Sequence, residues 1–134
     1  MLKNIKLFII LETLTALGMI LFWIGFFTVG MAPKNPPPGY FYFEKSFPLP
    51  DAILAAGLLA AARLLYKGHP AGRTISLVCG GALMFLGVLD FSFNYQNGMY
   101  KISAMDTTLN ASMNLWTVLF GLWLAITFRL KRTH

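Results

Sequence analysis

The sequence predicts an all-α integral membrane protein with four transmembrane helices in one antiparallel bundle. Two observations support this: 57% of the 134 residues are hydrophobic while only 12% are charged, and the apolar residues gather in four long runs. An ordinary soluble domain carries roughly a quarter charged residues. The composition therefore excludes a disordered chain, and the single cysteine, Cys79, excludes a disulfide-stapled secreted domain.

The four apolar runs cover residues 7–29, 49–66, 74–95 and 111–128. Each is close to the ~20 residues that a helix needs to cross a hydrocarbon core of ~30 Å. Basic residues precede the first run, as in a signal peptide, but the run is longer than the usual ~7–15 apolar residues of such a segment. We therefore expect a retained first helix and a single transmembrane domain over residues 1–134.

Helix-breaking and polar residues separate the runs. The link 30–48 contains three consecutive prolines, which we expect to be extended, and then aromatic residues that suit the headgroup level. The link 67–73 is a short turn of the kind that joins antiparallel helices. The link 96–108 is polar and is expected to be a loop.

The basic residues predict the orientation of the bundle. Those on the side of the termini are Lys3, Lys6, Lys67, Arg73, Arg129, Lys131 and Arg132. Those on the opposite side are Lys34, Lys45 and Lys101. The positive-inside rule then places both termini in the cytoplasm, in what we expect to be a prokaryotic cytoplasmic membrane. The net charge of +6 thus follows from topology and lipid headgroups, and no nucleic-acid partner is expected.

Small residues recur at four-residue spacing and indicate close helix packing. On the second helix these are Ala52, Ala56 and Ala60, with Gly57 and Ala61 beside them, and on the fourth Gly121 and Ala125. The third helix carries Gly80, Gly81 and Gly87. Such faces serve packing within the chain, a homo-oligomer, or docking to a larger membrane complex.

Glu12 and Arg63 fall at a similar depth from the cytoplasmic end, since a helix rises ~1.5 Å per residue. A lone charge inside the membrane is costly, so we expect a structural ion pair between them. The alternatives are that Arg63 snorkels by itself and that Glu12 relays protons or cations.

Asp90 has no basic residue near it in the outer half of any predicted helix. It lies about 9 Å inside the outer end of its helix. Asn94 follows one turn later on the same face, and the fourth helix contributes Asn114 at a similar depth. An intramembrane carboxylate of this kind marks a functional site by default. The candidate ligand-binding residues are Asp90, Asn94, Asn114, Asp51, Glu44 and Trp116.

Several of these residues also have a purely structural interpretation. Trp116, like Tyr95 and Tyr100, suits the aromatic belt at the membrane interface, with lining of a pocket as the alternative. Asp51 follows a proline and suits the first turn of a helix. Asn114 is of the type that bonds to a neighbouring helix, and a protonated Asp90 would lock the third helix to it. Asn97 and Gly98 suit a helix-ending turn.

No motif of a serine hydrolase, zinc protease, nucleotide-binding loop or dithiol redox site is present. Neither histidine lies within a predicted helix, so a haem is not expected. The sequence therefore predicts no catalytic residues, no metal site and no cofactor, and it does not favour an enzyme.

The four-helix plan, with Asp90, Asn114 and Trp116, resembles that of the EXPERA proteins, which include sterol isomerases and sigma-2-type binders. That resemblance implies a lipophilic amine or sterol held by intramembrane acids and an asparagine. It is confined to architecture, because an intramembrane histidine and a pair of acids one turn apart are missing. The chain also resembles small four-helix inner-membrane proteins of bacteria and archaea.

Three functions follow as expectations. The first is binding or transport of a small cationic or amphipathic ligand in an outward-facing site around Asp90. The second is that of a structural or accessory subunit of a larger membrane complex. The third is a lipid-modifying enzyme with Asp90 as acid or base, which requires a second titratable group beside it.

Overall fold

The computed structural model describes residues 4–30, 35–101 and 104–129, and this part of the chain is all-helical. Its elements are α1 (Ile5–Thr28), α2 (Tyr40–Glu44), α3 (Pro48–Tyr66), α4 (Ala71–Gln96), the 3-10 turn η1 (Met99–Lys101) and α5 (Ala104–Phe128).

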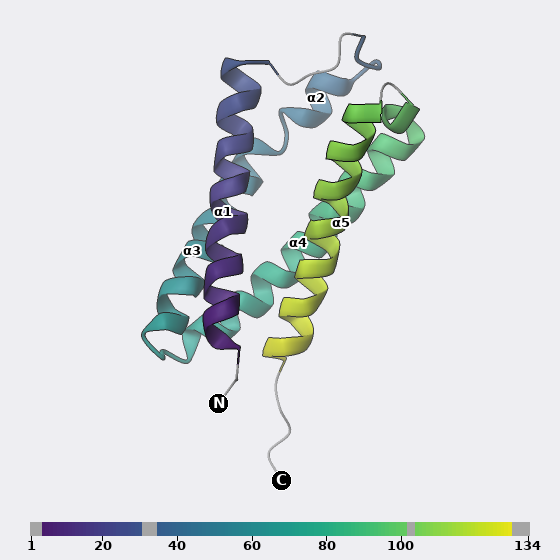
Figure 1. Ribbon diagram of the computed structural model, residues 1–134. Coiled ribbons are helices and arrows are strands. Elements are labelled where there is room, and N and C mark those ends of the chain that lie inside the picture. The colour runs from purple at the N-terminus through teal and green to yellow at the C-terminus, as the bar shows by residue number, and fades with distance from the viewer. Residues whose placement is uncertain (1–3, 31–34, 102–103, 130–134) are drawn as a thin grey trace.

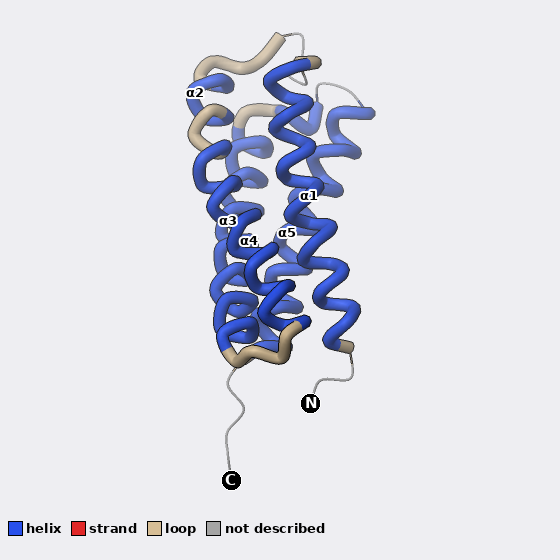
Figure 2. The backbone as a smooth tube through the Cα atoms, turned by 90° about the vertical axis from the view of Figure 1, so that its left-hand side faces the viewer, coloured by secondary structure: helices blue, strands red, loops and turns tan. Residues whose placement is uncertain are grey.

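The four long helices run up and down side by side, so that the first residue of α1 and the last of α5 lie at the same end (Figure 1). Helix α1 packs against α3, α5 packs against α4, and contacts between α3 and α4 join the two pairs. The short helix α2 lies at the opposite end of the bundle in both views (Figures 1 and 2). The predicted helical bundle is confirmed.

All four long helices have the length and apolar composition needed to cross a membrane. Large apolar side chains point away from the bundle on every one of them, including Leu21, Ile53, Phe85 and Leu119, each more than half exposed. A water-soluble protein rarely exposes apolar surface on this scale, whereas lipid tails would cover it without cost. The architecture is consistent with an integral membrane protein, and insertion into a membrane and the side on which the termini lie stay predictions.

The main hydrophobic core fills the half of the bundle nearer the termini. Leu58, Leu83, Phe120 and Leu124 are essentially inaccessible there. Phe8 of α1 packs edge-on against two rings of α5, with centroid distances of 4.7 Å to Trp123 and 5.4 Å to Phe128. This core closes α1 onto α5 at the terminal end.

Glycines bring α4 and α5 together at backbone distance. A Cβ atom on Gly80 would lie 2.7 Å from the carbonyl oxygen of Gly121, and one on Gly121 would lie 2.6 Å from that of Gly80. A Cβ atom on Gly87 would collide with the hydroxyl of Thr117. The predicted small-residue contact is therefore formed within the chain between these two helices.

On α3 the predicted packing face is formed only in part, because Ala52, Ala56 and Ala60 are exposed. Of the small residues beside them, Ala61 is buried, and a Cβ atom on Gly57 would lie 3.0 Å from the sulfur of Cys79 on α4. The buried face carries Leu54, Ala55, Leu58, Ala61, Ala62 and Leu65 instead. Small residues occur on both sides of this helix, so their spacing alone does not show which side meets a neighbour.

The aromatic stretch after the prolines, which we expected to lie at the level of the lipid headgroups, forms the short helix α2. Gly39 begins α2 with a φ of 81°, and the amides of Phe43 and Lys45 donate to the carbonyls of Gly39 and Phe41. Backbone groups near lipid must be satisfied within the protein, which favours a helical turn. Phe43 then stacks on Phe93 of α4 with a centroid distance of 3.8 Å.

Helix α5 begins at Ala104, seven residues before the predicted start at residue 111. The polar residues Thr107 and Thr108 belong to the predicted loop 96–108, yet they are helical. The hydroxyl of Thr108 donates to the carbonyl oxygen of Ala104 over 2.8 Å, so the backbone of its own helix satisfies this donor.

Candidate functional site

A cavity of about 500 Å³ lies in the half of the bundle away from the termini. Its walls come from α1, α3, α4 and α5, and α2 and η1 contribute Tyr40, Glu44 and Met99. Cavities of roughly 300–1,000 Å³ are typical of sites for small organic molecules.

Three carboxyl groups from three different elements line this cavity: Glu44 of α2, Asp51 of α3 and Asp90 of α4. Both aspartates lie within electrostatic range of Glu44, and Asp51 lies within electrostatic range of Asp90. No described residue that lines the cavity is a lysine or an arginine. When ionised, these three carboxylates have no counter-ion from the described residues that line the cavity.

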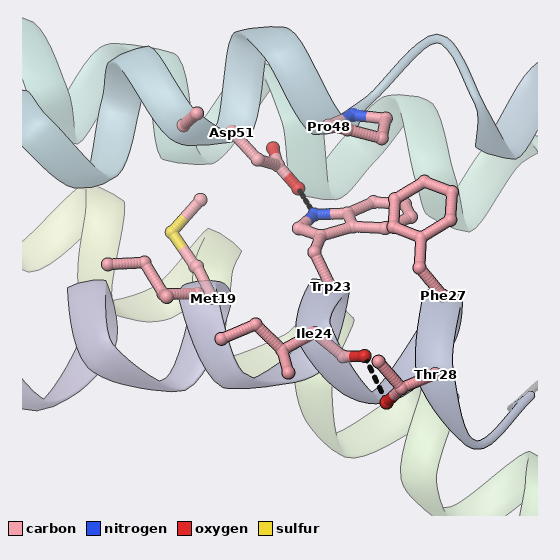
Figure 3. A pocket seen from close by; sticks show the side chains of 9 residues that line it. Met19, Trp23, Ile24, Phe27, Thr28, Pro48 and Asp51 are labelled. Carbon is pink, nitrogen blue, oxygen red and sulfur yellow. Dashed lines mark hydrogen bonds between the residues drawn. The ribbon is translucent and has the colours of Figure 1, made fainter.

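Asp51 is held by two interactions. Its amide donates to the carbonyl oxygen of Phe47 over 2.8 Å, in the first turn of a helix that begins at Pro48. The indole nitrogen of Trp23 donates to its Oδ2 over 2.8 Å (Figure 3). The structural interpretation of Asp51 as a first-turn carboxylate thus fits its position, and Trp23 additionally fixes its side chain.

Asp90 sits between two asparagines. The amide nitrogen of Asn94 approaches its Oδ2 at 3.4 Å, which is a long and weak contact. Asn114 of α5 lies beside the same carboxyl and donates over 2.7 Å to the hydroxyl of Tyr100. The asparagines therefore orient Asp90 without neutralising it.

Trp116 lines the cavity from the middle of α5. Its ring stacks on Phe120 at a centroid distance of 4.9 Å, and its indole nitrogen donates to the hydroxyl of Thr15 over 3.1 Å. This bond ties α5 to α1 at the middle of both helices. Trp23 and Trp116 thus present two indole rings to the cavity that holds the carboxyls.

The structure brings most of the predicted site residues together. Five of them line the one cavity: Asp90, Asn114, Asp51, Glu44 and Trp116. Asn94 is 2% exposed and lies behind Asp90 without lining the cavity. Asn97 ends α4, where its side chain donates to the carbonyl oxygen of Phe93.

The predicted ion pair between Glu12 and Arg63 is not formed. Glu12 is fully buried, both of its carboxylate oxygens lack a hydrogen-bond partner, and Arg63 is exposed. Glu12 instead lies beside Ser76 and Cys79 of α4. Equal depth in the membrane does not fix the rotation of each helix, and these two side chains point in different directions.

Two contributors were not expected from the sequence. Trp23 bonds to Asp51, and Tyr100, interpreted as a membrane-belt residue, bonds to Asn114. The available signal was the polar atom of each ring, because an indole N–H or a phenol placed in lipid requires a partner.

No group of three His, Cys, Asp or Glu side chains is placed to hold a metal ion among the residues that the structure describes. The carboxyls are instead spread around a space large enough for an organic molecule. Comparison with protein-family models, with curated proteins and with solved structures found no match.

Proposed function

We propose that this membrane protein binds a small organic cation in the cavity, with Asp90 as the main counter-charge. The single observation that carries the proposal is the meeting of Glu44, Asp51 and Asp90 on one cavity that no described basic side chain lines. Three like charges in one apolar site repel each other, and a bound cation relieves that repulsion.

The aromatic lining favours an organic ammonium over a small inorganic ion. A cation is attracted to the face of an aromatic ring, most strongly to that of tryptophan. Trp23 and Trp116 both line the cavity, and Phe22, Tyr40 and Phe47 complete an apolar wall around it. A ligand with a charged head and an apolar body matches both parts.

The test measures binding of dodecylammonium and of neutral dodecanol by calorimetry, to the full chain in phosphatidylcholine nanodiscs. Asp90→Asn should weaken dodecylammonium binding by about tenfold or more, because a counter-charge is lost, and leave dodecanol unaffected. Glu12→Gln is the matched control, since it removes a membrane carboxyl that does not line the cavity. Equal binding of dodecylammonium by wild type and Asp90→Asn would refute the proposal.

A second candidate function, lipid modification with Asp90 as acid or base, also has an observation in its favour. It requires a second titratable group near Asp90, and Glu44 lies within electrostatic range. Mass spectrometry of lipids incubated with wild type, Asp90→Asn and Glu44→Gln distinguishes the two functions. A product that needs both carboxyls would favour the enzyme, and an unchanged lipid profile would favour binding.

A further inference from the structure

The exposed part of the cavity wall comes from two helices. Among the described residues that line the cavity, five are exposed on the surface of the bundle: Leu14, Gly18, Leu109, Met113 and Trp116. The first two belong to α1 and the other three to α5. None of them is charged, whereas the three carboxyls lie farther in and are only partly exposed. The cavity therefore opens between α1 and α5.

The end of the cavity away from the termini is covered. Tyr40, Phe47 and Met99 line the cavity and are at most 8% exposed. Tyr40 and Met99 pack with Phe26 of α1 into one apolar cluster. Helix α2, which carries Tyr40, lies at this end of the bundle in both views (Figures 1 and 2). Apolar side chains therefore close the cavity at this end, and the outward-facing orientation of the site stays a prediction.

The opening also lies at a depth where lipid tails surround the helices. Leu14 is fourteen residues before the end of α1 at Thr28, which is about 21 Å along the helix axis. Met113 and Trp116 lie inside the segment Thr107–Phe128, which is long and apolar enough to span a membrane. A molecule that passes between these helices would therefore come from the bilayer.

We propose that the ligand reaches the cavity from the lipid phase, through the opening between α1 and α5, and that it is an ammonium group on an apolar chain without an anionic group. This inference rests on the proposed function and names the class of its ligand. The ammonium head lies against Asp90, Asp51 and Glu44, and the chain extends past Leu14 and Met113 towards the bilayer.

The charge of the lining excludes phosphate. A phospholipid headgroup would bring its phosphate near three carboxyls, with no described basic side chain in the wall to compensate. Juxtaposed like charges disfavour binding. A free long-chain amine meets no such penalty, so it is the occupant to which the geometry points.

Gly18 and Gly81 offer a matched pair of variants. A Cβ atom added to either glycine meets no atom within 4 Å, and both residues are exposed on long helices. Gly18 lines the cavity and Gly81 does not. Gly18→Phe therefore adds a ring at the opening, while Gly81→Phe adds the same ring elsewhere on the bundle.

The experiment follows the tryptophan fluorescence of the full chain in phosphatidylcholine nanodiscs after mixing with dodecylammonium, since two tryptophans line the cavity. Gly18→Phe should slow association by about tenfold or more, and Gly81→Phe should leave the rate near that of wild type. Met113→Trp narrows the opening from α5, and Leu122→Trp, outside the cavity on the same helix, is its control. If Gly18→Phe does not fold, this second pair of variants tests whether the ligand enters between α1 and α5.

The outcomes separate the route from the function. Equal rates for each variant and its control, while binding still depends on Asp90, would overturn entry from the lipid and leave the proposed function standing. Loss of the Asp90 dependence would instead overturn the function. Phosphatidylethanolamine added to the nanodiscs should not compete with dodecylammonium, and competition that needs Asp90 would overturn the exclusion of phosphate.

Discussion

Trp23 and Asp51 are joined by a hydrogen bond of 2.8 Å between the indole Nε1 and the carboxylate Oδ2, which ties α1 to α3 (Figure 3). Both residues line the interior cavity, and both also line an apolar hollow of about 430 Å³ between the outward sides of the two helices. The bond is therefore part of the wall between the interior cavity and this outward hollow.

Removing the indole donor should weaken that wall. Trp23→Phe keeps an aromatic ring but leaves the Asp51 carboxylate without this donor, which should cost about 1–3 kcal/mol of stability. The measurement is thermal unfolding of the purified chain in detergent, followed by circular dichroism. Trp123→Phe, which alters a tryptophan that does not line the cavity, controls for loss of an indole. A Trp23→Phe variant as stable as wild type would mean that the bond does not hold the helices together.

The close approach of α4 and α5 gives a prediction on two neighbouring glycines. Gly80→Ala places a Cβ atom 2.7 Å from the carbonyl oxygen of Gly121 and should destabilise the bundle by about 1–3 kcal/mol, because backbone must shift. Gly81→Ala meets open space and should be neutral or stabilising by about 0.5–1 kcal/mol, because alanine favours the helix. Unfolding of the two variants in the same detergent compares them directly. Equal effects would show that the helices do not meet at Gly80.

The isolation of Glu12 predicts the energetic behaviour of the charged pair that the sequence suggested. Glu12→Met removes a buried carboxyl without a hydrogen-bond partner and should raise stability by about 1–3 kcal/mol. Arg63→Gln alters an exposed side chain and should change it by less than about 0.5 kcal/mol.

The double variant tests whether the two residues interact. Since Glu12 and Arg63 are not in contact, the two effects should add to within about 0.5 kcal/mol. Thermal unfolding of all four proteins gives the coupling energy. A coupling well above that size would show that the two charges meet after all.

The orientation predicted from the basic residues is tested by labelling of single cysteines. In a Cys79→Ser background, Lys45→Cys should react with a membrane-impermeant maleimide on intact cells, and Lys67→Cys should react only after lysis. Both parent lysines are exposed, and they lie in the connections at opposite ends of the bundle. The reverse labelling pattern would invert the topology and place the covered end of the cavity in the cytoplasm.

The sequence by itself determined the all-helical class and the number and approximate extent of the helices that are long and apolar enough to span a membrane. Long apolar runs leave few alternatives in lipid, because every backbone polar group must be satisfied within its own segment. The sequence also placed Asp51, Asp90 and Asn114 at a common depth, since depth follows from counting residues along a helix.

Only the tertiary structure decided which side chains meet at a given depth. The depth of a residue does not fix the rotation of its helix about its own axis. Glu12 and Arg63 therefore lie at a similar depth but point in different directions, whereas Asp90 and Asn114 lie at a similar depth and face each other. The same freedom turned Ala52 outward and Ala55 inward on one helix. The cover formed by α2 and the opening between α1 and α5 depend on contacts between residues far apart in the chain, which no local pattern of hydrophobicity specifies.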